Sequence, residues 1–215
     1  NALWKSLRCV GVSPFLLKLI EDVHTCTSSR VQHGGRLSDN FNTTSRVRQG
    51  CILAPALFCC AIDWILGRCA RNLGTKVGSD LFTDLDYADD AVLFNDAPGG
   101  WTTCLQQFED EAGSMGLHTS WAKTKVQNVS SGPTPVAISV AGQTVEPVEK
   151  FTYLGSDIDS GGHSTPDIRR RLGLASSTMG QLDRVWRNKR LSSSTKMRIY
   201  SSCVLPVFLY GSESW

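Results

Sequence analysis

Two adjacent carboxylates, Asp89 and Asp90, interrupt a run of strand-forming residues in the segment LFTDLDYADDAVLF. Carboxylate oxygens are the preferred protein ligands of hard cations such as Mg²⁺. A pair of such cations can catalyse nucleotidyl transfer, with one at the attacking hydroxyl and one at the departing pyrophosphate. The acidic pair is therefore a candidate metal-holding turn. The alternative is a solvated acidic loop tip that keeps a hairpin soluble.

The metal-holding interpretation requires a turn beside the two carboxylates. Neighbouring side chains of an extended chain point to opposite faces, so both can reach one metal cluster only if the backbone bends there. Ala88 is small, and strand-forming residues flank the pair on both sides. The segment 76–95 is therefore predicted to form a hairpin with the acidic pair at its turn, although by itself such a pair is more typical of a solvated loop.

The elements around this hairpin follow from apolar periodicity and from glycine and proline positions. Helices are predicted over residues 3–7, 14–23, 55–73, 101–116, 166–186 and 194–204, with Ser13 as an N-cap and Gly74 as a terminator. Short strands are predicted in a polar hairpin that turns at Gly34-Gly35, in VAISV and TVEPV joined across Ala141-Gly142, and in FTYLG. The Ser/Gly-rich stretch SDIDSGGHST is predicted to be a domain boundary.

Alternating helices and strands followed by a helical tail indicate an α+β domain with a small helical module. The length of 215 residues and the hydrophobic content of 41% allow one large domain or a domain with an appendage. The most apolar segment, ILAPALFCCAIDWIL, has 15 residues and carries Asp63. It is shorter than the roughly 20 apolar residues of a membrane span, so we expect a buried helix and no membrane partner.

The 8 cysteines show neither a CxxC pair nor a regular spacing. A zinc site needs paired ligands at short spacing, and a secreted disulfide scaffold is usually a shorter chain. Reduced thiols and an intracellular location are therefore expected.

Positive charge is concentrated in the predicted helical tail. The whole chain has a formal net charge of +2, but residues 167–198 hold nine basic residues and two acids. The basic residues are Arg169, Arg170, Arg171, Arg184, Arg187, Lys189, Arg190, Lys196 and Arg198. The tail is a candidate footprint for a phosphate backbone, and a well-solvated helix face is an equal alternative.

Five segments in collinear order resemble the sequence boxes of reverse transcriptases. DYADD resembles their YxDD box, and RVRQGCILAPALF resembles the RQGxxxSP box of non-LTR (LINE-type) retrotransposon polymerases, with Ala54 where serine is frequent. GLHTSWAKTKV resembles the GLxxNxxKTK box, with Ser120 in place of asparagine. FTYLGS resembles the primer-grip turn, and the helices that end in LYGSESW resemble the thumb region. The chain thus resembles a reverse transcriptase domain of a LINE-type retrotransposon.

The resemblance implies a fold and a set of partners. Residues 1–158 would be an incomplete fingers and palm-like domain, and residues 159–215 a thumb-like helical module with the start of the following segment. The activity would be RNA-directed DNA polymerisation, with Mg²⁺ as cofactor and an RNA template, a DNA primer and dNTPs as partners. The family also implies a nuclear location.

The resemblance assigns roles to matching residues. Asp89 and Asp90 would be the catalytic metal ligands, Asp89 directly and Asp90 more peripherally. Gln49, Gly50, Tyr87 and Lys123 would contact the nucleotide, and Tyr153, Leu154 and Gly155 the primer end. Arg169, Arg170, Arg184, Arg187, Lys189 and Arg190 would contact the nucleic-acid backbone.

Each assigned role has an ordinary structural alternative. Gln49 and Gly50 can form a turn that leads into a helix, and Tyr87 can pack on a strand. Lys123 can be a solvated loop residue, and the segment 153–155 can be a core strand and its turn.

One carboxylate of the resembled family is missing. The family places a further Asp in a strand upstream of these boxes, and we expect that residue to lie before residue 1. Glu21, Asp22, Asp39 and Asp63 fall in predicted helices or in a polar hairpin and are poor substitutes. The chain by itself is therefore expected to be inactive. A non-catalytic nucleic-acid-binding transposon remnant is the main alternative, and a structural protein without a polymer ligand is the third.

Overall fold

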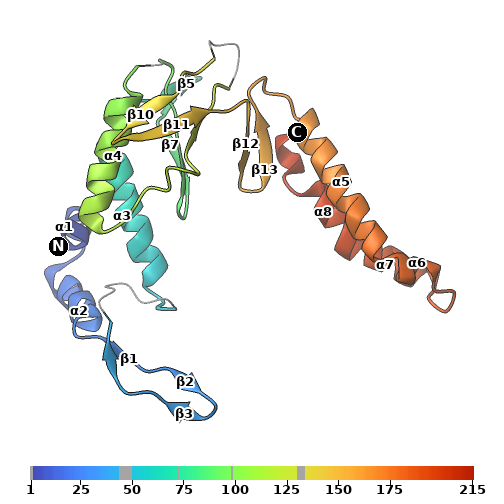
Figure 1. The fold of residues 1–215 in the computed structure, drawn as a ribbon, viewed down its shortest axis with the longest axis horizontal. Helices are drawn as coiled ribbons and strands as arrows, with labels where there is room; N and C mark the ends of the chain where they lie inside the picture. Colours follow the sequence, from blue (N-terminus) through green and yellow to red (C-terminus); the bar gives the residue numbers. More distant parts are fainter. Residues whose placement is uncertain (1, 44–49, 72, 98, 130–133) are drawn as a thin grey trace. The chain divides into compact units, whose positions relative to one another are not determined.

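The structure is a computed structural model that describes residues 2–43, 50–71, 73–97, 99–129 and 134–215 (Figure 1). Its contacts divide the chain into two compact units. The first unit comprises residues 1–120 with 140–142, and the second comprises residues 121–139 with 143–215.

The described residues of the first unit form four helices and a series of short antiparallel hairpins. Its helices are α1 (Ala2–Cys9), α2 (Pro14–His24), α3 (Ala54–Cys69) and α4 (Trp101–Met115). Its strands are β1 (Ser28–Ser29), β2 (Gln32–His33), β3 (Arg36–Leu37), β4 (Phe41–Asn42), β5 (Thr75–Val77), β6 (Asp80–Phe82), β7 (Asp84–Tyr87) and β8 (Asp90–Leu93). The pairs β1-β4, β2-β3, β5-β6 and β7-β8 are each two-stranded.

The core of the first unit lies between α3 and α4, which run side by side in Figure 1. Ile62, Leu66 and Cys69 of α3 are buried together with Cys104 of α4. Leu93 of β8 packs against the same cluster, so the acidic hairpin is attached to this core through its second strand.

Helix α2 begins as predicted. The Ser13 hydroxyl accepts a hydrogen bond from the Leu16 amide at 3.4 Å, and Pro14 occupies the first helical position. These two features satisfy one free amide of the first turn and fix φ where no amide donor is needed. The C-terminus of α4 at Gly116, in the left-handed conformation, is also confirmed.

The predicted end of the third helix at Gly74 was wrong. Helix α3 ends at Cys69 with Ala70 as its C-cap, and Leu73 is buried in the core beyond it. Gly74 has a φ of 138° and forms a bridge with Asn95. A Cβ at position 74 would lie 2.8 Å from Leu81 Cδ1, so the glycine is needed for close approach of the β6 strand and not for helix termination.

The second unit combines short strands with a helical module. Its strands are β9 (Lys125–Val126), β10 (Ile138–Val140), β11 (Gln143–Pro147), β12 (Lys150–Tyr153) and β13 (Ser156–Asp159), and the last residue of β10 is grouped with the first unit. Its helices are α5 (Thr165–Gln181), α6 (Asp183–Arg187), α7 (Ser193–Ile199), a π-helical segment (Tyr200–Val204), α8 (Leu205–Leu209) and a 3₁₀ turn (Ser212–Ser214). The predicted joining of β10 and β11 across Ala141-Gly142 is confirmed, in a sheet of order β10-β11-β9.

The stretch SDIDSGGHST, predicted to be a domain boundary, begins with a strand. Residues 156–159 form β13, which pairs with β12 from Lys150↔Asp159 to Tyr153↔Ser156. The left-handed pair Leu154-Gly155 closes this hairpin and lets the chain return along β12. The contacts group residues 143–158 with the helical module, while the division into palm and thumb at residues 158 and 159 stays a prediction.

The predicted helical tail is confirmed in outline. Figure 1 shows α5 with the chain returning through α7 and α8, so that the C-terminus lies near the start of α5. No helix in the described part of the chain is long and apolar enough to cross a membrane. All 8 cysteines are free thiols.

Candidate active site

The acidic hairpin is a tight antiparallel pair with the two carboxylates at its turn. Strand β7 pairs with β8 so that Tyr87 lies opposite Asp90 and Asp86 lies opposite Ala91. Only Ala88 and Asp89 form the connection between the strands. The predicted hairpin with the acidic pair at its turn is therefore confirmed for residues 84–93, while residues 75–82 form a separate hairpin, β5-β6.

The strand register sorts the acidic residues onto different faces. Directly opposite residues of an antiparallel pair share a face, so Asp90 lies on the face of Tyr87. Asp84 and Asp86 lie on the other face with Leu93, whose side chain packs on the core of the first unit. The β7 acids therefore stay apart from Asp90, and Asp89 projects from the tip between the two faces.

Ala88 holds the turn in a backbone conformation that L residues rarely adopt. Its φ is 56°. A non-glycine residue in this region costs roughly 1–2 kcal/mol. Such outliers persist where the surrounding structure fixes them, often at functional sites. Here the paired strands fix it, and the result is an aspartate at the outermost point of the hairpin.

The environment of the acidic pair leaves its oxygens available. Asp89 and Asp90 are exposed, and Tyr87 is 65% exposed. No described residue donates a hydrogen bond to either carboxylate or forms an ion pair with it. Two free carboxylates suit a hard cation, because Mg²⁺ takes one or two carboxylates together with waters and substrate phosphates.

Among the described residues, Asp89 and Asp90 are the carboxylates at the turn of the hairpin. Within the described ranges, no group of three or more His, Cys, Asp or Glu residues is placed to hold a metal ion. Asp89 and Asp90 therefore fit Mg²⁺ by their chemistry, but they offer fewer protein ligands than a site with a third carboxylate.

The other nucleotide-contact candidates lie outside the hairpin. Gly50 precedes α3 with a φ of 83°, and a Cβ added there would meet nothing within 4 Å. Gln49 lies outside the described residues. Lys123 is an exposed turn residue of the second unit, so it and the hairpin belong to different units.

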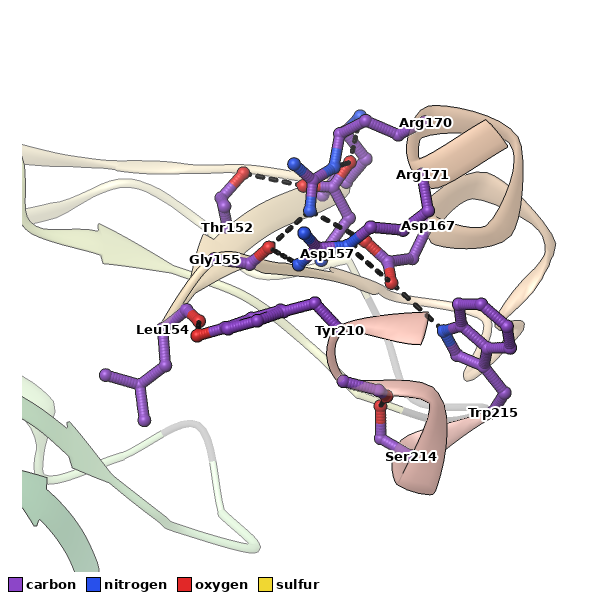
Figure 2. A network of polar contacts seen from close by, with 12 residues as sticks. Thr152, Leu154, Gly155, Asp157, Asp167, Arg170, Arg171, Tyr210, Ser214 and Trp215 are labelled. Atoms are coloured by element: carbon purple, nitrogen blue, oxygen red, sulfur yellow. Dashed lines mark hydrogen bonds and ion pairs between the residues drawn. The ribbon is translucent and has the colours of Figure 1, made fainter. Parts of the chain in front are cut away.

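The three primer-end candidates lie together at the turn between β12 and β13. Tyr153 pairs with Ser156, and Leu154 and Gly155 form the turn with φ values of 47° and 80°. Figure 2 shows that this turn is surrounded by polar groups of the helical module. The Leu154 carbonyl accepts a hydrogen bond from the Tyr210 hydroxyl at 2.8 Å.

The second carbonyl of this turn is also bonded. Arg170 and Arg171 each donate an Nη2–H to the Gly155 carbonyl oxygen (Figure 2). Arg171 is buried, and its guanidinium lies 4.4 Å from the centre of the Tyr210 ring. The turn is therefore held by donors from α5 and from the C-terminal segment.

Asp157 of β13 is a buried centre of this network. Its carboxylate forms ion pairs with Lys150 at 2.8 Å and with Arg170 at 3.2 Å, and accepts a hydrogen bond from Thr152 at 2.7 Å. Burial opposes ionisation of Asp157, but the hydrogen bonds from Lys150 and Thr152 and the charge of Arg170 lower its pKa overall.

Asp167, near the start of α5, is the second buried carboxylate. Its Oδ1 accepts hydrogen bonds from the Asp157 amide at 3.0 Å and from Arg170 at 2.8 Å. Its Oδ2 accepts one from the Trp215 indole at 3.1 Å and lies 3.8 Å from Arg171 Nε. Burial again opposes ionisation, yet these donors lower the pKa of Asp167. Sequence reasoning missed both carboxylates, although the Asp167-Arg170 spacing of three on a helix was a usable signal.

The basic residues of the tail differ in the partners of their charges. Arg170 and Arg171 are held inside the network described above. Arg187 forms an exposed ion pair with Asp183 at 2.8 Å. The remaining candidates are exposed, and their side chains form no ion pair with the part of the chain that the structure describes; they are Arg169, Arg184, Lys189 and Arg190.

Comparisons with known proteins match the sequence to one family. Residues 3–158 match the family described as reverse transcriptase (RNA-dependent DNA polymerase). A transposon-derived protein of Caenorhabditis elegans is 29% identical over 147 residues, which is 65% of this chain and 51% of that protein. A retrovirus-related Pol polyprotein from the type-1 retrotransposable element R2 of Nasonia vitripennis is 29% identical over 63% of this chain.

A similar R2 polyprotein of Popillia japonica extends the likeness into the helical module. It is 24% identical over 95% of this chain. The chain covers 34% of that polyprotein and 13% of the Nasonia one, so it spans only part of the relatives that it matches. The family match covers more than half of the chain, including the acidic hairpin, and confirms the expected resemblance: the chain belongs to the reverse transcriptase family and is similar to the Pol polyproteins of non-LTR retrotransposable elements.

Proposed function

We propose that the chain supplies part of the active site of an RNA-directed DNA polymerase, which extends a DNA primer on an RNA template with dNTPs. In this reaction the primer 3′ hydroxyl attacks the α-phosphorus of the dNTP, and the bond to pyrophosphate breaks. The observation that supports the proposal most directly is the tight acidic hairpin inside the family-matched residues, with both carboxylates exposed and without a partner among the described residues. A nuclear location is part of the proposal.

Asp89 and Asp90 would hold Mg²⁺, Asp89 directly and Asp90 from the face that it shares with Tyr87. Bound Mg²⁺ would neutralise charge at the attacking hydroxyl and at the leaving pyrophosphate. Gln49, Gly50 and Tyr87 would shape the nucleotide pocket, where a glycine permits close approach of the ligand to the backbone.

The remaining roles fall to residues of the second unit. Lys123 would stabilise the negative charge of the leaving pyrophosphate. Tyr153, Leu154 and Gly155 would contact the primer end. The basic residues proposed to follow the nucleic-acid backbone are Arg169, Arg170, Arg184, Arg187, Lys189 and Arg190.

We further propose that this chain by itself does not polymerise at a measurable rate. The described residues bring only two carboxylates to the turn of the hairpin and no third ligand. Charge stabilisation by a metal contributes several kcal/mol, and each 1.36 kcal/mol changes a rate about tenfold, so an incomplete ligand set lowers the rate by several orders of magnitude.

The site is tested by nucleotide binding, which does not require turnover. Binding of a fluorescent dNTP to the chain is measured with Mg²⁺ and with EDTA, for the wild type, Asp89→Ala and Asp86→Ala. Asp86 is the matched control, since it lies in the same hairpin on the opposite face. Mg²⁺-dependent binding that only Asp89→Ala removes supports the site, and equal loss in both variants contradicts it.

The proposed inactivity has its own test. Primer extension on an RNA template with Mg²⁺ is expected to give no robust dNTP incorporation by the isolated chain. Robust incorporation that disappears in Asp89→Ala would overturn the inactivity while supporting the polymerase site.

A non-catalytic nucleic-acid-binding role is the second candidate. The exposed basic residues around α6 and the following loop favour it, because their charges are not consumed by ion pairs with described residues. Such binding weakens steeply with salt. RNA binding that is salt-dependent and unchanged in Asp89→Ala, in a chain without Mg²⁺-dependent dNTP binding, would favour this candidate over the polymerase.

A further inference from the structure

The turn between β12 and β13 is unusual in having both of its carbonyls bonded by distant side chains. The Tyr210 hydroxyl donates to the Leu154 carbonyl across 56 positions of sequence. The guanidinium groups of Arg170 and Arg171 donate to the Gly155 carbonyl. A hairpin tip normally presents such carbonyls to water, so these donors restrict the turn to one orientation.

The ring of Tyr210 packs against the turn as well. A Cβ at position 155 would lie 3.4 Å from Tyr210 Cε1, so the ring lies directly on the glycine backbone. The Arg171 guanidinium lies 4.4 Å from the ring centre and also donates to the Gly155 carbonyl, so it contacts the ring and the turn together. The Tyr210 ring therefore packs against both a buried cation and the turn, which leaves its hydroxyl little freedom.

The last residues of the described chain anchor this tyrosine. Trp215 donates its indole N–H to Asp167 at 3.1 Å and meets the Phe208 ring at 5.5 Å in an edge-to-face contact. A Cβ at Gly211 would collide with the Ser156 hydroxyl oxygen, so this glycine packs directly against Ser156. Trp215 thus fixes the segment to α5, and Gly211 packs it against β13.

We propose that Tyr210 and Trp215 are positioning residues for the Leu154-Gly155 turn, and that they set the geometry with which this turn contacts the primer end. The inference rests on the proposed function, in which the turn bears on the primer. Tyr210 acts through the Leu154 carbonyl, and Trp215 acts through Asp167.

The Leu154 side chain is the part of the turn that is available to contact a primer end. The Leu154 side chain is 39% exposed and extends away from the network in Figure 2. With both carbonyls occupied, the turn would offer this apolar side chain and its backbone edge to a ligand. An apolar contact of that kind suits the sugar or base of a terminal nucleotide and carries no sequence preference.

The inference is tested with Tyr210→Phe in the full 215-residue chain, which removes the hydroxyl and keeps the ring. Tyr200→Phe is the matched control, because Tyr200 lies in the same helical module outside the network. Hydrogen exchange of residues 153–156 is measured first. One lost hydrogen bond is expected to speed exchange by roughly threefold to tenfold in Tyr210→Phe and to leave it unchanged in Tyr200→Phe.

The second readout is the preference for a primer end. Affinity is measured for an RNA template carrying a recessed DNA primer and for the same RNA alone. We expect Tyr210→Phe to lower the ratio of the two affinities roughly threefold to tenfold while binding of RNA alone stays unchanged. A merely structural role would change both affinities together. Trp215→Phe, which removes the indole donor, is expected to act in the same direction.

The outcomes separate this inference from the proposed function. If the wild type prefers the primer end and Tyr210→Phe keeps that preference, the positioning role is overturned and the proposed function stands. Exchange at the turn that is equal in Tyr210→Phe and Tyr200→Phe also overturns the positioning role. A wild type without any preference for the primer end contradicts the proposed contact of the turn with primer and this inference with it, whereas Mg²⁺-dependent dNTP binding tests the acidic hairpin independently.

Discussion

The turns of hairpins β7-β8 and β12-β13 share one backbone feature but differ in what their polar groups contact. Ala88-Asp89 and Leu154-Gly155 are both two-residue connections that begin with a non-glycine residue at positive φ. The first turn carries exposed carboxylates without described partners, while both carbonyls of the second are bonded by the helical module. A turn with free polar groups is ready to bind a ligand, and a turn with occupied ones is fixed in place.

The largest loss of stability is expected when the buried network around Asp157 and Asp167 loses a carboxylate. Asp167→Ala would leave the Arg171 guanidinium buried without its carboxylate and the Asp157 amide without an acceptor. Loss of one partner of a buried pair costs about 3–5 kcal/mol of the free energy of unfolding. Chemical denaturation measures this loss.

Asp183→Ala is the control for that prediction. It removes an ion pair whose side chains are 51% and 81% exposed, so the expected cost is at most about 1 kcal/mol. Equal destabilisation by the two substitutions would contradict the distinction between the buried network and the solvated helix surface.

Acidification should act on the same network, less strongly than Asp167→Ala because a protonated carboxyl still accepts hydrogen bonds. The pKa values of Asp157 and Asp167 are lowered from their ordinary value of 3.8. Their contribution is therefore complete well above pH 3.8 and is lost as the pH falls through the lower folded values. Denaturation at a series of pH values should show this loss, and Asp157→Asn should flatten the curve. A stability that rises between pH 5 and pH 3 would contradict the ion-pair account.

Alanine substitution of two glycines tests whether the Tyr210 ring packs tightly on the Leu154-Gly155 turn. Gly155→Ala imposes a side chain at a φ of 80° and 3.4 Å from Tyr210, while Gly162→Ala imposes the same backbone strain at a φ of 70° with nothing within 4 Å. Gly162→Ala should cost roughly 1–2 kcal/mol of unfolding free energy. Gly155→Ala should cost more, and the difference should shrink when Tyr210 is also replaced by alanine. Equal costs would show that the tyrosine ring does not press on the turn.

The smallest change in stability is expected for substitutions in the acidic hairpin. Ala88→Gly relieves strain of roughly 1–2 kcal/mol but adds flexibility to the unfolded chain, so a net gain of about 0.5–1 kcal/mol is expected. Ala91→Gly in the adjoining strand β8 has no strain to relieve and should lose about 0.5–1 kcal/mol. Thermal unfolding of the two variants compares them, and a loss in both would contradict strain at Ala88.

Local patterns predicted the acidic hairpin and several helix ends. The Ser13-Pro14 start, the Gly116 end and the strands around Asp89 and Asp90 each depend on residues within a few positions of one another. Gly74 misled the prediction because a buried Leu73 and the close approach of Leu81, both tertiary effects, outweighed its local tendency to end a helix.

The network around the second turn could not be predicted in the same way. Its contacts join residues 48 and 56 positions apart, as in Trp215 with Asp167 and Tyr210 with Leu154. Composition showed Arg170 and Arg171 only as two of the positive charges of the tail, and folding shows that both donate to the Gly155 carbonyl. Resemblance to a family singled out residues 153–155 as candidates for a primer contact, but only the folded chain shows what holds their turn.

The proposed polymerase site requires that the acidic hairpin bind a divalent cation. Paramagnetic Mn²⁺ can replace Mg²⁺ as a probe, since both take oxygen ligands. In the amide NMR spectrum of the chain, substoichiometric Mn²⁺ should broaden the signals of residues 87–91 first. The broadening should weaken at least tenfold in Asp89→Ala and persist in Asp86→Ala. Broadening that spares residues 87–91 in the wild type, or that is the same in both variants, would contradict cation binding by the acidic pair.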